Sequence, residues 1–256
     1  MRIVGFQMRS VVGNIPENLD KIEVAARDAA AQGGRLLITP ELALTGYGAD
    51  HSFIHLAVPA NSHVTDRLDD IARRNNIAII AGFAQQDGDA IFNSALFTEG
   101  RGETRIYRKS HLYGPYEKHW FCADDPSSVL IAVENIKIGM LICYDVEFPE
   151  NVRRLAKAGA DLVVVPTALP SGASGHFIAN HMIRVRAFEN QVFLAYVNHC
   201  GSDEKFSYAG LSQVAAPDGR LLAQASPEEE GLIFAEIDPS AFDKSRSENS
   251  YLSDLR

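Results

Sequence analysis

Short apolar runs alternate with amphipathic helical patterns along the first part of this chain, and that alternation limits the possible folds more than any other feature. Apolar runs bounded by turn residues predict buried strands at residues 2–8, 35–39 and 77–83. Apolar side chains recur at helical spacing over residues 16–31 and 62–76, where Pro16 and Ser62 suit helix starts. The chain is therefore expected to be an α/β protein in which helices cover sheets.

The second half predicts strand pairs as well as helices. A hairpin is expected over residues 129–133 and 136–142, with Glu134 and Asn135 at its turn. Helices are expected at residues 149–158 and 177–190, and further strands at residues 91–97, 104–107, 161–165, 192–197, 211–215, 220–223 and 231–236. These elements predict a single domain over residues 1–238, followed by a polar tail over 239–256 that lies on the surface or at a subunit interface.

Composition excludes several classes of protein. A net charge of −9 disfavours nucleic acid and anionic membranes as partners. No apolar run approaches the roughly 18 residues of a membrane span, and three widely spaced cysteines form no disulfide framework. The sequence lacks phosphate-binding and dinucleotide-binding glycine motifs and cysteine pairs at zinc spacing, so we expect no cofactor and no metal. A cytoplasmic location is the expectation.

Cys143 is the first candidate for chemistry. It ends an apolar strand and precedes a helix that opens at Pro149. A side chain on such a strand-to-helix turn is pushed out at the sheet edge, where backbone N–H groups can face an oxyanion. The alternative is a small buried hydrophobe, which describes most free cysteines.

Two charged residues also follow directly after predicted strands. Glu41 follows the strand at 35–39 and is either a base for the thiol or a solvated strand end. Lys109 follows the strand at 104–107 and is either a site residue or part of a solvated basic turn. A lysine near a thiol favours the thiolate. Sites in α/β folds gather at the carboxyl ends of strands, so these three residues are expected to meet.

With these residues in place, the chain resembles the nitrilase superfamily of carbon–nitrogen hydrolases, in its amidase-like branch. The resemblance covers nearly the whole chain and rests on the order and spacing of three motifs: Pro40-Glu41-Leu42 with Thr45-Gly46-Tyr47, Tyr107-Arg108-Lys109-Ser110-His111-Leu112, and Ile142-Cys143-Tyr144-Asp145 with Phe148-Pro149-Glu150. It implies a four-layer αββα sandwich that pairs with a second subunit into an αββα–αββα homodimer.

The resemblance also implies a Glu-Lys-Cys triad. Glu41 would be the general base, Cys143 the nucleophile that forms a thioester, and Lys109 the group that stabilises the oxyanion together with the backbone N–H of Tyr144. Glu117 matches the second glutamate of the family and would orient Lys109. A carboxylate close to another carboxylate keeps a raised pKa, so the charged groups are expected to titrate as a coupled cluster.

Residues near the triad bear on the substrate. In the nitrilases of this superfamily the motif at the cysteine resembles Cys-Trp-Glu, whereas this chain has Cys143-Tyr144-Asp145, which favours hydrolysis of amides over nitriles. The aromatic residues Tyr47, Tyr116, Trp120, Phe121 and Tyr144 are expected to line a small pocket, with a place in the core as the alternative for Trp120 and Phe121. Glu147 stands where many relatives have arginine, which disfavours an ω-amidase and favours neutral or cationic amides; an ion pair with Arg153 or Arg154 is the alternative.

The expected function is hydrolysis of small carboxamides to a carboxylic acid and ammonia. An N-carbamoyl amine or amino-acid amidohydrolase using the same triad is the alternative, and an ω-amidase a weaker one. A cysteine–histidine dyad and a non-catalytic binding protein on this fold remain further possibilities.

Overall fold

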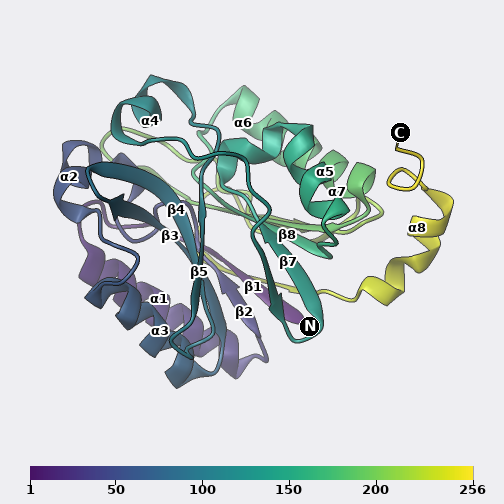
Figure 1. Ribbon diagram of the computed structural model, residues 1–256, viewed down its shortest axis with the longest axis horizontal. Helices are drawn as coiled ribbons and strands as arrows, with labels where there is room; N and C mark the ends of the chain where they lie inside the picture. Colours follow the sequence, from purple (N-terminus) through teal and green to yellow (C-terminus); the bar gives the residue numbers. More distant parts are fainter. Residues whose placement is uncertain (256) are drawn as a thin grey trace.

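The computed structural model describes residues 1–255 and contains two six-stranded sheets packed face to face (Figure 1). The first sheet has the order β12-β1-β2-β3-β4-β5, with bounds Gly231–Glu236, Arg2–Gln7, Leu36–Ile38, Ala78–Asp87, Ala90–Thr98 and Thr104–Arg108. The second has the order β11-β10-β9-β8-β7-β6, with bounds Leu221–Gln224, Gln213–Ala215, Phe193–Asn198, Leu162–Thr167, Ile136–Met140 and Leu130–Val133.

Helices cover the outer face of each sheet, which gives the four layers αββα (Figure 1). On the first sheet lie α1 (Ile15–Ala31) and α3 (His63–Asn75). On the second lie α5 (Pro149–Lys157), α6 (Ala173–Phe177) and α7 (Ile183–Asn190). Short helices α2 (Phe53–Leu56) and α4 (Gly114–Trp120) sit over the loops, and α8 (Asp243–Glu248) belongs to the tail. The predicted α/β sandwich is thus confirmed.

Strand alternation explains why the layers pack this way. Because successive side chains of a strand point to opposite faces, Ile3, Leu36 and Ile38 enter the core between the sheets. Val4 and Leu37 point outward into the core beneath α1 and α3. Each sheet is therefore buried on both faces, as the nearly continuous apolar runs predict.

Local capping places the helices close to where the sequence predicts them. The Ser62 side chain accepts a hydrogen bond from the backbone N–H of Thr65 and begins α3, and Asn76 ends it in the left-handed region. The hairpin turns at Glu134, as expected, with a φ of 53°. The helix predicted at 177–190 is different: it begins at Ala173 and contains a π-helical segment, Ile178–Met182. Gly175 permits the early start, because a Cβ there would lie 2.0 Å from the Pro170 carbonyl oxygen.

The C-terminal tail lies against α7 rather than free in solvent. Ser245 donates to the Gln191 side chain, and the Tyr251 ring packs on Phe188 at 5.7 Å between centroids. The segment ends at one side of the molecule, beyond the second sheet (Figure 1). Across residues 1–255, the helices are all too short or too polar to cross a bilayer.

Candidate functional site

The structure brings Glu41, Lys109, Glu117 and Cys143 together at one end of the sandwich. Glu41 follows β2 and Lys109 follows β5, both in the first sheet, whereas Cys143 follows β7 of the second. Glu117 comes from the first turn of α4. All four are buried, with relative exposures between 0% and 7%. Segments from both sheets and from α4 thus bring these four side chains into one buried cluster.

Lys109 bridges the two carboxylates. Its Nζ donates to Glu41 Oε1 at 2.6 Å and to Glu117 Oε1 at 2.7 Å. Asn93 of β4 donates to the same Glu41 oxygen at 2.7 Å, and the Tyr47 hydroxyl donates to Glu117 Oε1 at 2.8 Å. Within residues 1–255, Glu41 Oε2 has no hydrogen-bond partner. That oxygen is buried, so it is available to accept a proton from a group at the site.

Burial and mutual charge set the protonation states. Burial raises the pKa of Glu41 to about 7, and the charge of Glu117 adds to this while Lys109 opposes it. For Lys109, burial lowers the pKa, but the two carboxylates outweigh it and hold the pKa well above its usual value. The site therefore holds an ammonium beside a carboxyl poised to exchange a proton near neutral pH.

Lys109 favours the thiolate of Cys143, as expected, but burial outweighs it and holds the thiol pKa high. Burial raises its pKa well above the usual range and the charge of Glu41 raises it further, against the lowering effect of Lys109. Desolvation dominates because the thiolate would lose its hydration inside the sandwich. The nucleophile thus needs a base, and the free oxygen of Glu41 is suited to that role.

The backbone at Cys143 is held in an unusual conformation. Its φ is 44°, in the left-handed region that a residue with a Cβ rarely adopts, and it begins a 3₁₀ turn, Cys143–Glu147. Strain of this kind persists only where surrounding contacts over-determine the conformation. Those contacts come chiefly from Asp145.

Asp145 joins the lysine loop to the cysteine turn. Its fully buried carboxylate accepts from the Tyr107 hydroxyl at 2.9 Å, from Ser110 Oγ at 2.8 Å, from the His111 backbone at 2.9 Å and from the Ile142 backbone at 3.1 Å. The sequence marks Asp145 only by its place two residues after Cys143, and no local signal indicates that it links the two loops.

His199 makes a corresponding contact to Glu41. It follows β9 of the second sheet, and its Nε2 lies 2.7 Å from the Glu41 carbonyl oxygen. Burial lowers the pKa of His199 to about 4, so the ring is neutral and carries its proton on the nitrogen that faces the carbonyl. This contact spans the two sheets and fixes the main chain that presents Glu41.

An aromatic cavity of about 260 Å³ lies beside the cluster. Of the five predicted aromatic residues, Tyr47 and Tyr116 line it, together with Tyr113, Gly114, Pro115, Ala168, Pro170, Phe206 and Tyr208. Trp120 and Phe121 instead pack against Phe53, with ring centroids 6.4 Å and 4.8 Å away. Tyr144 does not line it: its ring packs edge-on against Tyr113 at 5.2 Å and Phe148 at 5.0 Å. Because Tyr47 lines the cavity and also bonds Glu117, the cavity opens next to the charged residues.

Glu147 ends the cysteine turn and is half-buried. The expected alternative, an ion pair with Arg153 or Arg154, is not formed. Arg154 instead donates to the Asn151 side chain at 2.7 Å and to the Ser127 carbonyl at 3.0 Å. The Glu147 carboxylate has no ion-pair partner among residues 1–255.

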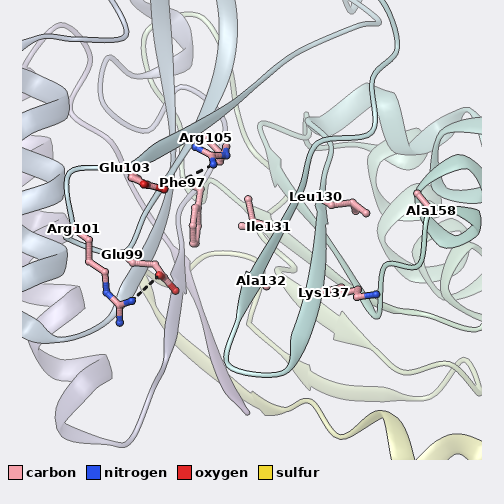
Figure 2. Close-up of a pocket in the computed structure, with 10 residues that line it drawn as sticks. All are labelled: Phe97, Glu99, Arg101, Glu103, Arg105, Leu130, Ile131, Ala132, Lys137 and Ala158. Carbon is pink, nitrogen blue, oxygen red and sulfur yellow. Dashed lines mark ion pairs between the residues drawn. The ribbon is translucent and has the colours of Figure 1, made fainter.

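A larger hollow, of about 630 Å³, lies elsewhere, between the far ends of β4 and β5 and the β6–β7 hairpin (Figure 2). Its charged residues pair locally, Arg101 with Glu99 at 3.9 Å and Arg105 with Glu103 at 3.8 Å. Neither the four clustered catalytic candidates nor the residues that hydrogen-bond to them line this hollow. The smaller aromatic cavity does have such a link, because Tyr47 lines it and donates to Glu117, so chemistry is assigned to that cavity. Across residues 1–255 no three metal-ligating side chains converge on a point.

Comparison with known proteins gives consistent matches over the whole chain. The family model for carbon–nitrogen hydrolases matches residues 3–246. A hydrolase from the pqqF 5′ region of Pseudomonas protegens is 38% identical over 100% of this chain and 89% of its own length. An (R)-stereoselective amidase from a Pseudomonas species is 31% identical, over 95% of this chain and 85% of its own.

The solved amidase of Nesterenkonia sp. AN1 has a similar structure. It superimposes with a TM-score of 0.90 at 34% identity, over 100% of this chain and 96% of its own. Further structures of that amidase show acrylamide added to its active-site cysteine and butyramide bound to a variant.

Proposed function

Since the chain belongs to the carbon–nitrogen hydrolase family, as an amidase of the nitrilase superfamily, we propose that it hydrolyses small carboxamides through a thioester on Cys143. The observation that carries this proposal is the buried Lys109 bridging Glu41 and Glu117 next to a buried thiol. The small aromatic cavity at the cluster supports a small substrate.

The first half-reaction transfers the acyl group to sulfur. Glu41 takes the thiol proton, and Sγ of Cys143 forms a bond to the amide carbon. The oxyanion that develops is stabilised by the ammonium of Lys109 and by the backbone N–H of Tyr144. Glu41 then returns its proton to the amide nitrogen, the carbon–nitrogen bond breaks, and ammonia leaves.

The second half-reaction restores the thiol. Glu41 takes a proton from a water molecule, whose oxygen attacks the thioester carbon, and the same two donors stabilise the second oxyanion. The carbon–sulfur bond breaks and sulfur takes the proton back. Glu117 holds Lys109 in place throughout, since its two oxygens accept from Nζ and from the Tyr113 backbone.

Ammonia release from a panel of small amides, N-carbamoyl compounds and nitriles tests this proposal. Cys143→Ala and Glu41→Gln are each expected to abolish release, and mass spectrometry of quenched wild-type reactions should show the acyl adduct on Cys143. Release confined to carbamoyl compounds, with carbon dioxide as a second product, would instead establish the carbamoylase alternative. Loss of activity on changing a histidine while Glu41→Gln stays active would indicate a cysteine–histidine dyad.

We also propose that residues 1–238 form the hydrolase domain and that the tail takes part in a homodimer. The exposed side chains of Phe177 on α6 and Val185 on α7, at 58% and 51%, support an interface on the outer face of the second sheet. Light scattering tests this: Val185→Glu and deletion of residues 239–256 are each expected to shift the protein toward monomer.

A further inference from the structure

The side chain of Asn93 carries a buried hydrogen-bond acceptor that the proposed mechanism does not use. Asn93 is fully buried, and its Nδ2 donates at 2.7 Å to Glu41 Oε1, an oxygen that also accepts from Lys109. Because the amide nitrogen faces Glu41, the oxygen Oδ1 forms the other end of the group. Among residues 1–255, Asn93 Oδ1 has no hydrogen-bond partner. A buried acceptor without a donor costs free energy, which a ligand that supplies an N–H group would recover.

Strand alternation directs the Asn93 side chain toward the sheet that carries the nucleophile. Asn93 lies in β4, and the side chains two and four positions further along, Ala95 and Phe97, belong to the core between the sheets. Residues at this spacing line one face of a strand, so Asn93 points into the same space. Cys143 approaches that space from the opposite side, because it follows β7 of the second sheet.

The donors of Lys109 and Cys143 are committed elsewhere. Lys109 Nζ donates to Glu41 and to Glu117, and its third N–H stabilises the oxyanion in the proposed reaction. The thiol of Cys143 has a single proton, which passes to Glu41. The donor for Asn93 Oδ1 therefore comes with the substrate.

A primary carboxamide carries a matching donor. Its NH₂ group has two N–H bonds, whereas an amide with one substituent on nitrogen has one and an ester has none. In the proposed reaction the amide nitrogen lies beside Glu41, which returns a proton to it. Since the Asn93 amide group is hydrogen-bonded to the same carboxyl group, a nitrogen beside Glu41 lies beside Asn93 as well.

Building on the proposed amidase function, we infer that Asn93 is a further catalytic residue, whose Oδ1 accepts a hydrogen bond from the NH₂ group of a primary amide and holds that nitrogen beside Glu41. Sγ of Cys143 bonds to the carbonyl carbon while the thiol proton passes to Glu41 Oε2, and the nitrogen then has a free lone pair. With one N–H held by Asn93, that lone pair faces Oε2 and takes the proton, the carbon–nitrogen bond breaks, and ammonia leaves. Primary amides are therefore preferred to N-substituted amides and to esters.

Butyramide and methyl butyrate test the inference, because both form the same butyryl thioester and differ only in the leaving group. Deacylation is common to the two substrates, so the ratio of their kcat/KM values reports the acylation step alone. Asn93→Ala should lower the ratio of butyramide to methyl butyrate about tenfold, which corresponds to about 1.4 kcal/mol. The values are compared at a pH where Glu41 is ionised in each variant.

Two further variants separate the acceptor of Asn93 from its other contacts. Asn93→Asp keeps the acceptor but loses the N–H that donates to Glu41, so it should lower kcat/KM for both substrates and keep their ratio within about twofold. Ser94→Ala is the matched control, since Ser94 Oγ donates at 2.9 Å to Gln85 on the opposite face of β4. It should change neither the ratio nor the two kcat/KM values.

The wild-type enzyme covers the case in which the Asn93 variants do not fold. N-Methylbutyramide has one N–H fewer than butyramide, and its kcat/KM should be at least about tenfold lower. Equal kcat/KM values for these two amides, or an amide-to-ester ratio that Asn93→Ala leaves unchanged, would overturn the inference while leaving amide hydrolysis intact. If the wild-type enzyme hydrolyses none of the three compounds, the proposed function fails, and the inference fails with it.

Discussion

Replacing Asp145 with asparagine tests whether the two catalytic loops depend on a single buried carboxylate. Oδ1 accepts from Ser110 Oγ at 2.8 Å and from the His111 backbone N–H at 2.9 Å. Oδ2 accepts from the Tyr107 hydroxyl at 2.9 Å and from the Ile142 backbone N–H at 3.1 Å. A carboxylate satisfies all four donors because both of its oxygens accept.

An amide cannot do so in either orientation. Its NH₂ group would face the backbone N–H of His111 or that of Ile142, and a backbone donor cannot reverse its role. The variant therefore loses two charge-assisted hydrogen bonds and leaves a buried donor unsatisfied, which costs about 3–5 kcal/mol of unfolding free energy. Because these contacts position Lys109 relative to Cys143, and misplacement by about 1 Å costs on the order of 100-fold, kcat should fall to a similar extent.

Urea denaturation and steady-state kinetics on one amide measure the two effects. Asp161→Asn is the matched control, since Asp161 accepts from the Lys137 backbone N–H at 3.0 Å beside the turn of the β6–β7 hairpin, away from the cluster. It should lower stability without changing kcat. If Asp145→Asn loses stability but keeps kcat within about twofold, the coupling between the loops is refuted.

Three further predictions follow from the cluster and the backbone around it. The kcat/KM for butyramide should rise with pH along a limb near 7, because Glu41 must be ionised to take the thiol proton and its pKa is raised to about 7. Asn93→Ala should move this limb to higher pH, since the hydrogen bond from Asn93 lowers the pKa of Glu41. A flat pH profile would contradict the prediction. The same shift means that the folded state binds the Glu41 proton more tightly than the unfolded state does. The contribution of Glu41 to the free energy of unfolding is therefore full below pH 4.5 and is lost by about pH 7. Glu41→Gln should remove about 3 kcal/mol of this pH dependence, as measured by denaturation curves at several pH values. Gly82→Ala should lower the free energy of unfolding by about 3 kcal/mol or more and also lower kcat, because the new Cβ would lie 2.4 Å from the backbone flanking Glu41. Gly88→Ala is the control: its Cβ would have nothing within 4 Å, so it should cost only about 1 kcal/mol, through its positive φ.

The parts of the site that the sequence predicts are those that local signals mark. Glu41, Lys109 and Cys143 each follow a short apolar run, and polar residues there are unusual enough to be noticed without a structure. The helix starts at Pro16 and Ser62 carry capping signals within a few residues. Local chemistry therefore predicts strand ends and helix starts well.

Long-range pairing is what local signals do not contain. β1 pairs with β12, so that Arg2 lies opposite Glu236, and nothing near either residue specifies the other. The division of twelve strands into two sheets was available only through family resemblance. For the same reason the roles of Asn93, Asp145 and His199 were missed, because a buried polar side chain is explained only by the partner it meets in three dimensions.

The cluster itself is an argument that chemistry, and not stability, accounts for its charges. Moving an ammonium and two carboxylates out of water costs several kcal/mol for each ion, and their attraction repays this only with good geometry. Here the geometry is supplied from both sheets: Glu41 and Lys109 come from the first, Cys143 from the second, and His199 and Asp145 connect them. The distance from nucleophile to base is thus set by how the two sheets pack. Substitutions in the core between the sheets should consequently affect turnover as well as the free energy of unfolding.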